Sequence, residues 1–207
     1  MAFRVGYWNW SRDLYRELLK TTGGKERMTV FMRDHLRQTP DPDLIARIHV
    51  DKTARYGDLI SQGAATLRPG IIDLITDAAA QGCRLAVATT TNRPNVDRLI
   101  ESTMGRAAGD VFEVIAAGDE VANKKPAPDV FNLALAGLGL DPQSCVALED
   151  SPNGLMSAKG AGIPCIVSPG IYTNDADFAQ ADAVVDCFSR IATLNDLHQS
   201  LMTPKGA

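Results

Sequence analysis

Residues 145–154 read CVALEDSPNG, and this stretch decides the fold class. Its apolar first half is typical of a buried strand, and the strand runs straight into the carboxylates of Glu149 and Asp150. A helix is expected over Asn153–Ala161, and the next apolar strand is expected at Cys165–Val167. A strand, a helix and a strand in this order are typical of a parallel sheet covered by helices, which binds ligands beyond the carboxyl ends of its strands.

The same alternation covers the chain from Leu67 onward. Helices are expected over residues 71–80, 95–104, 128–138, 153–161 and 191–201, and strands over 85–89, 114–116, 145–148, 165–167 and 183–185. Up to about Gly63 the apolar residues instead recur at helical spacing, with Phe3–Trp10 as an ambiguous strand candidate. We therefore expect an α/β, Rossmann-like parallel-sheet core over residues 67–207 and a small α-helical cap domain over residues 1–66.

The composition excludes several classes of protein. The net charge of −4 provides no basic field for nucleic acid or an anionic membrane, and no apolar run is long enough to span a bilayer. The N-terminus lacks the layout of a signal peptide. The four cysteines include no C-x-x-C pair, so we expect buried thiols in a reducing cytoplasm, in preference to zinc ligands or disulfides.

Two polar segments follow expected strands and could contact a phosphate. The strand at 85–89 ends in Thr89, Thr90 and Asn92, whose hydroxyls and loop amides could hold a phosphoryl oxygen. The same residue types also cap helices, and taken alone that explanation is preferred. Lys125 stands before a proline-fixed helix start and could point a compact positive charge into a cleft, although a solvated surface lysine is the simpler alternative.

The third segment contains Glu149 and Asp150, which follow the strand quoted above. Carboxylates at a strand end that face a phosphate cleft suit Mg²⁺. Acidic residues are also stabilising at any helix N-terminus, so this segment alone leaves both interpretations open. The three segments become specific together, because each follows an apolar strand and each supplies a different part of a phosphoryl-transfer site.

These motifs resemble those of the haloacid dehalogenase (HAD) superfamily. The segments Lys125–Asp129 and Leu148–Ser151 are similar to its phosphoglycolate phosphatase and β-phosphoglucomutase branch, and Thr22–Arg27 is similar to its CbbY-like members. The resemblance covers essentially the whole chain. It implies a Mg²⁺-dependent phosphatase of small phosphorylated sugars, such as the xylulose 1,5-bisphosphate of carbon fixation, and it implies a cytoplasmic protein that we expect to be a monomer. A β-phosphoglucomutase-like mutase and a non-catalytic phosphosugar-binding remnant are the alternatives.

The resemblance also implies a role for each candidate residue. Thr89 and Lys125 would be catalytic, holding a phosphoryl oxygen and neutralising charge, and Mg²⁺ would be bound by Asp150 and, directly or through its outer shell, by Glu149. The expected contacts to substrate are Gly23, Gly24, Lys25, Arg27, Lys52, Arg68, Thr90 and Asn92. A solvated basic face is the alternative for Lys25, Arg27, Lys52 and Arg68.

The Asp-x-Asp segment with which the family opens has no counterpart among the 207 residues, because no acidic residue precedes Asp13. In the family this segment follows the first strand of the core, a central strand, and supplies the aspartate that attacks phosphorus. We expect a gap between the strands at 85–89 and 145–148, and no turnover by the 207-residue polypeptide as printed. There are three possible explanations. The start codon is assigned too late, the gene is a remnant, or the gap is filled by the Phe3–Trp10 segment or by a partner.

Overall fold

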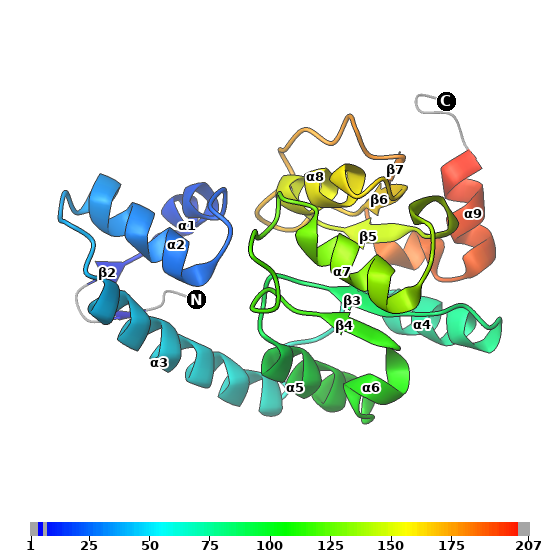
Figure 1. Ribbon diagram of the computed structural model, residues 1–207, viewed down its shortest axis with the longest axis horizontal. Coiled ribbons are helices and arrows are strands. Elements are labelled where there is room, and N and C mark those ends of the chain that lie inside the picture. The colour runs from blue at the N-terminus through cyan, green and yellow to red at the C-terminus, as the bar shows by residue number, and fades with distance from the viewer. Residues whose placement is uncertain (1–3, 6–7, 203–207) are drawn as a thin grey trace. The chain divides into compact units, whose positions relative to one another are not determined.

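The computed structural model describes residues 4–5 and 8–202, and the chain divides into two compact units, Met1–Leu59 and Ile60–Ala207 (Figure 1). We had placed the boundary between Thr66 and Leu67. The division falls earlier, between Leu59 and Ile60. Among the described residues, no helix combines the length and the apolar character needed to cross a bilayer.

The N-terminal unit is mainly helical, as expected. It contains the two-residue strands β1 (Arg4–Val5) and β2 (Trp8–Asn9), the helices α1 (Arg12–Leu18) and α2 (Gly24–Val30), a π-helical turn (Phe31–His35) and the start of α3 (Pro42–Ser61). The Ser11 side chain accepts a hydrogen bond from the Leu14 amide and caps α1, as its position predicts. The apolar core of this unit joins Met28, Met32, Ile45 and Ile48, with Trp8 and Trp10 packed against it.

Strands β1 and β2 pair with each other in antiparallel register, Arg4 with Asn9 and Val5 with Trp8. Together they form a separate two-stranded sheet. The described residues of the Phe3–Trp10 segment therefore do not fill the expected gap in the core sheet, and that explanation is wrong. The two backbones satisfy each other's hydrogen bonds instead.

The second unit alternates strands and helices, as predicted. Its strands are β3 (Ala86–Ala88), β4 (Val114–Ala116), β5 (Ala147–Glu149), β6 (Cys165–Val167) and β7 (Ala183–Val184). Its helices are α4 (Ile71–Ala80), α5 (Arg93–Met104), α6 (Ala108–Val111), α7 (Asp129–Leu138), α8 (Pro152–Gly160) and α9 (Leu194–Met202), with 3-10 turns at Pro142–Ser144 and Phe188–Ile191. The sequence missed α6, whose four residues are too few to show a helical period.

All strand pairs in this unit are parallel, and they form two separate sheets. Strand β3 pairs with β4, while β5 pairs with β6 and β6 with β7. Within the described residues β3 and β5 do not pair, so the expected gap between them is confirmed.

Packed helices hold the two sheets together. One apolar cluster contains Ala88 of β3 and Ala147 of β5 together with Val130 of α7 and Leu155 of α8, so these helices share a core with both sheets (Figure 1). Helix α4 also packs against both sheets. Leu74 lies in the apolar cluster of Ile166 of β6, and its neighbour Ile75 lies in the cluster of Val96, against which Val87 of β3 packs. Burial in these shared clusters holds β3 and β5 in place without a ladder between them.

The turn before α4 depends on a glycine. Gly70 has φ +87°, and a Cβ atom at this position would overlap the backbone of Phe188 and Ser189. Gly82, after the same helix, has φ +78° but has nothing within 4 Å of such an atom. The two glycines therefore separate the cost of a left-handed backbone from the cost of a steric overlap.

We predict that Gly82→Ala lowers the free energy of unfolding by about 1–2 kcal/mol, the cost of a left-handed backbone alone. Gly70→Ala should cost about 1–3 kcal/mol more, because the backbone of Phe188 and Ser189 must move to admit the methyl group. Urea unfolding followed by circular dichroism measures both losses. If both variants lost the same free energy of unfolding, the backbone around Gly70 would be able to move and admit the methyl group without cost.

Candidate active site

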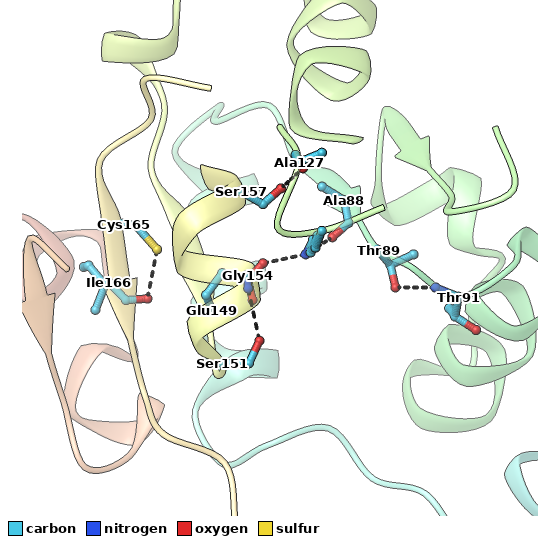
Figure 2. A network of polar contacts seen from close by, with 11 residues as sticks. Ala88, Thr89, Thr91, Ala127, Glu149, Ser151, Gly154, Ser157, Cys165 and Ile166 are labelled. Carbon is cyan, nitrogen blue, oxygen red and sulfur yellow. Dashed lines mark hydrogen bonds and ion pairs between the residues drawn. The ribbon is translucent and has the colours of Figure 1, made fainter. Parts of the chain in front are cut away.

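Lys125 connects the carboxyl ends of the two core sheets. Its ammonium donates to the carbonyl oxygen of Ala88, at 2.9 Å, and to Oε1 of Glu149, at 2.5 Å (Figure 2). Ala88 is the last residue of β3 and Glu149 the last of β5. One cation is therefore held between two strand ends whose backbones do not pair.

The loop that carries Lys125 is fixed on both sides. Asn123 donates to Oδ1 of Asp129 from its backbone amide and its side chain, at 3.2 and 3.0 Å, and so closes the loop before α7. The Ser157 hydroxyl of α8 donates to the Ala127 carbonyl at 2.6 Å (Figure 2). These contacts preorganise the lysine, whose flexible stem would otherwise lose entropy on reaching its partners.

Glu149 is buried, with its side chain 9% exposed against 11% for Lys125. Burial raises the pKa of the Glu149 carboxyl, and the adjacent Lys125 ammonium opposes that rise. The carboxylate also lies directly over Gly154, where a Cβ atom would overlap it. Gly154 is therefore required for space, a role that the sequence did not reveal, although the motif quoted above ends on this glycine.

The hydroxyl cluster after β3 has mixed roles. Thr89 follows the strand directly, and its hydroxyl accepts a hydrogen bond from the Thr91 amide at 3.2 Å (Figure 2). Oδ1 of Asn92 accepts from the Asn95 amide at 3.1 Å and caps α5, which is the alternative that the sequence left open. The Thr90 backbone packs against Gly118, at which a Cβ atom would overlap it. Of this cluster, Thr89 lies nearest in the chain to the Ala88 carbonyl that holds Lys125.

Asp150 follows β5 and has an exposed side chain. Its carbonyl oxygen accepts from the Gly170 amide at 3.1 Å and from the Thr173 hydroxyl at 2.6 Å, so the loop after β6 fixes its backbone. The described residues contain no group of three or more acidic, histidine or cysteine side chains that could hold a metal ion. Mg²⁺ commonly binds through one or two carboxylates, with water and phosphate oxygens as the other ligands, and Asp150 fits that pattern. Glu149 fits it less directly, because Lys125 already occupies Oε1.

The N-terminal unit brings cations together at the start of α2. Burial is the main cause that lowers the pKa of Lys52, and the positive charge of Arg27 lowers it further. A Cβ atom at Gly24 would lie 2.8 Å from the His49 ring and 3.6 Å from the Lys52 stem. The sequence missed His49, although its position three residues before Lys52 on α3 places both on one helix face. Lys25, the lysine of α2, is exposed, and Gly23, with φ +98°, is the N-cap residue before this helix.

Arg27 is engaged within its own unit. Its guanidinium donates to the carbonyl oxygens of Leu18, at 3.2 Å, and Thr21, at 3.3 Å, and it lies 5.5 Å from the centre of the Tyr15 ring. These contacts tie the end of α1 to α2. Arg27 is therefore not part of a solvated basic face, which was the alternative from sequence. Its role toward substrate stays a prediction.

Arg68 is likewise engaged. Its guanidinium donates to the carbonyl and the hydroxyl of Ser168, at 2.5 and 2.8 Å, and to the Pro169 carbonyl at 3.2 Å. It also lies 4.9 Å from the centre of the Phe188 ring. The structure therefore places Arg68 in contact with Ser168, Pro169 and Phe188 inside the core unit, and its role toward substrate stays a prediction.

The chain also matches known proteins along most of its length. A family model described as haloacid dehalogenase-like hydrolase matches residues 4–162. The chain belongs to the haloacid dehalogenase-like hydrolases. It is 54% identical to Protein CbbY of Cereibacter sphaeroides over 92% of this chain and 82% of that protein, and 53% identical to Protein CbbY of Rhodobacter capsulatus over 90% and 82%.

Solved structures agree with the fold of this HAD-like hydrolase. CbbY from Rhodobacter sphaeroides in complex with phosphate matches with a TM-score of 0.86 and 52% identity, over 93% of this chain and 85% of that one. A mutant of the same protein in complex with xylulose-(1,5)bisphosphate matches with a TM-score of 0.85 and 52% identity, over 92% and 84%. The predicted family, the α/β fold and the phosphatase type of hydrolase are confirmed.

The pair of Lys125 and Glu149 leads to a prediction about stability and pH. A carboxyl whose pKa is raised by folding contributes stability at low pH and loses it as the pH rises through the folded value. Lys125→Met removes the charge that opposes the rise, so it should raise the pKa of Glu149 further. The loss of stability should be small at pH 5 and reach about 3–5 kcal/mol at pH 8, as for other broken buried pairs.

Urea unfolding of both proteins at pH 5 and pH 8 measures this difference. The matched control is the double variant Lys125→Met/Glu149→Gln, which carries no titrating group at the pair. Its free energy of unfolding should change less between pH 5 and pH 8 than that of Lys125→Met, because no group titrates at the pair. A pH-independent loss in Lys125→Met itself would contradict the assigned role of Glu149.

Proposed function

We propose that this chain is, by lineage, a Mg²⁺-dependent phosphatase of small phosphorylated sugars, with a bisphosphate such as xylulose 1,5-bisphosphate as the substrate, and that these 207 residues alone do not turn it over. The observation that carries the proposal is the Lys125 ammonium, held between the strand ends of Ala88 and Glu149. The 52% identity to a CbbY structure that contains this bisphosphate supports the choice of substrate.

Each group at the strand ends has a task suited to a phosphate. A preorganised ammonium stabilises negative charge on phosphoryl oxygens without having to reorganise during the reaction. The Thr89 hydroxyl can donate to one of those oxygens while it accepts from the Thr91 amide. Asp150 would hold Mg²⁺, which when bound neutralises phosphate charge. Glu149 would keep Lys125 oriented.

The N-terminal unit has the other feature that a bisphosphate requires. Lys52 is half-buried beside Arg27, so two like charges stand close together. The Glu26 carboxylate already acts on Arg27, and a phosphate of this substrate would add an anion for Lys52. Lys25 and His49 lie at the same helix start and would add donors.

The first test measures turnover. Because the sequence predicts that these 207 residues lack the family's attacking aspartate, the assay uses them as they stand and with the N-terminal segment of the Cereibacter sphaeroides protein added. We predict phosphate release from sugar phosphates by the extended protein alone. In that protein Lys125→Ala should lower turnover by about 10²–10³, as for the loss of one preorganised stabilising group.

Lys124→Ala is the matched control, because it removes the neighbouring lysine and leaves the contacts of Lys125 in place. Its turnover should equal that of the unchanged protein, and circular dichroism checks that each variant is folded. Two outcomes count against the proposal. Equal turnover in Lys125→Ala would remove the lysine from the reaction, and conversion of glucose 1-phosphate to glucose 6-phosphate would identify a mutase.

The second test separates the two phosphates. Lys52→Met in the extended protein should raise KM for a sugar bisphosphate about tenfold or more and leave KM for a monophosphate nearly unchanged, since a charge-assisted contact of about 1.5–3 kcal/mol is lost. Lys25→Ala should act in the same direction. Lys20→Ala is the control, because Lys20 is exposed and paired with Glu17.

The pH profile gives an independent measurement of the same contact. Because burial and Arg27 lower the pKa of Lys52, its charge is lost at a lower pH than that of an ordinary lysine. KM for the bisphosphate should therefore rise on the alkaline side, and Lys52→Met should abolish that rise. Equal changes for monophosphate and bisphosphate would contradict a contact to the second phosphate.

A further inference from the structure

The loop after β6 encloses the backbone of the two strand-end carboxylates. The Ser168 amide donates to the Glu149 carbonyl at 2.9 Å, and the Gly170 amide donates to the Asp150 carbonyl at 3.1 Å. The Thr173 hydroxyl donates to the same Asp150 oxygen at 2.6 Å and accepts from the Gly170 amide at 2.9 Å. The orientation of Asp150 is therefore set by where this loop lies.

The loop also limits the Asp150 side chain directly. A Cβ atom at Gly170 would lie 3.3 Å from Oδ2 of Asp150, so the glycine stands against the carboxylate. A shift of the loop by a fraction of an ångström would change both the backbone and the side chain of Asp150. Sites for metals need their supporting partners held to about 0.5 Å.

Arg68 is the residue that holds this loop from the other side. Its guanidinium makes hydrogen bonds to Ser168 and Pro169, the two residues that lead into Gly170. Ser168 is fully buried, and its hydroxyl also donates to the Asp186 carbonyl at 3.2 Å. Phe188 covers the guanidinium, so the planar group is fixed by hydrogen bonds at its edge and by a ring against its face.

We propose that Arg68 is a positioning residue for the metal site, which it serves by fixing the loop 168–173 against Asp150. The inference rests on the proposed function in one respect, the assignment of Asp150 as a ligand of a divalent cation. It replaces the direct substrate contact that the sequence predicts for Arg68. A planar, forked donor is required, because one side chain must reach two carbonyl oxygens and a hydroxyl at once.

The test measures metal binding and loop order separately, on the full chain. Mn²⁺ serves as the probe, because carboxylate and carbonyl sites that accept Mg²⁺ also accept Mn²⁺, and electron paramagnetic resonance counts the free ion. The variants are Arg68→Met, Arg68→Lys, Asp150→Asn and the double variant Arg68→Met/Asp150→Asn. Arg84→Met is the control, since Arg84 forms an exposed ion pair with Glu113 in the same unit.

We expect Arg68→Met to weaken Mn²⁺ binding about tenfold, the lower end for loss of an outer-shell partner. Arg68→Lys should behave nearly the same, because it keeps the charge and loses the fork. Amide hydrogen exchange should accelerate at Gly170 and Thr173 in both variants. In the Asp150→Asn background, Arg68→Met should cause no further loss of Mn²⁺ affinity, because the ligand through which it acts is gone.

Three results would overturn the inference, and they differ from one another. Faster exchange in the loop with unchanged Mn²⁺ affinity would make Arg68 a structural residue only. Full affinity in Arg68→Lys would mean that its charge matters and its geometry does not. If Asp150→Asn itself left Mn²⁺ binding unchanged, the metal assignment of the proposed function would fail, and the inference with it.

Discussion

The buried ion pair between Lys125 and Glu149 is the interaction on which the rest of the core unit depends. Taking two charges out of water is expensive, and their attraction compensates only if the geometry is good and other hydrogen bonds complete it. The surrounding structure meets that condition through the Ala88 carbonyl, the open space at Gly154 and the loop that Ser157 anchors. A pair that is held this firmly between two sheets is poorly suited to a purely structural role, since apolar residues would fill the position at lower cost.

The chain surrounds this pair with groups that are less constrained. Thr89 follows β3 and Asp150 follows β5, the two strands whose last residues contact Lys125. Neither Thr89 nor Asp150 is a buried charge. Asp150 is exposed and is oriented through its backbone, which leaves its carboxylate available to a cation. The two carboxylates differ because Glu149 is the buried last residue of β5, whereas Asp150 lies in the exposed bend that follows the strand.

The N-terminal unit instead gathers cations at the start of α2, where the charge of Arg27 acts on Lys52 and the carboxylate of Glu26 acts on Arg27. Carbonyl oxygens of Leu18 and Thr21 fix the guanidinium, and this leaves the Lys52 ammonium half-buried beside a like charge. Gly24 gives His49 and Lys52 room at this point, because any larger residue would meet the imidazole ring.

Local patterns were sufficient for the fold class, for most elements and for the three segments at the strand ends. These features depend on residues that are close together in the chain. They are the strand and helix periods, the positions of proline and glycine, and the apolar strand that runs into Glu149 and Asp150. Local stereochemistry is therefore enough to predict them. The partners of Lys125 could not be read in this way, because Ala88 lies 37 and Glu149 24 residues away along the chain. The same holds for Arg68, which looked like any surface cation until packing placed Ser168, 100 residues later, against its guanidinium. A side chain's charge is fixed by its own residue, but its task is set by the atoms that the folded chain brings within hydrogen-bonding distance.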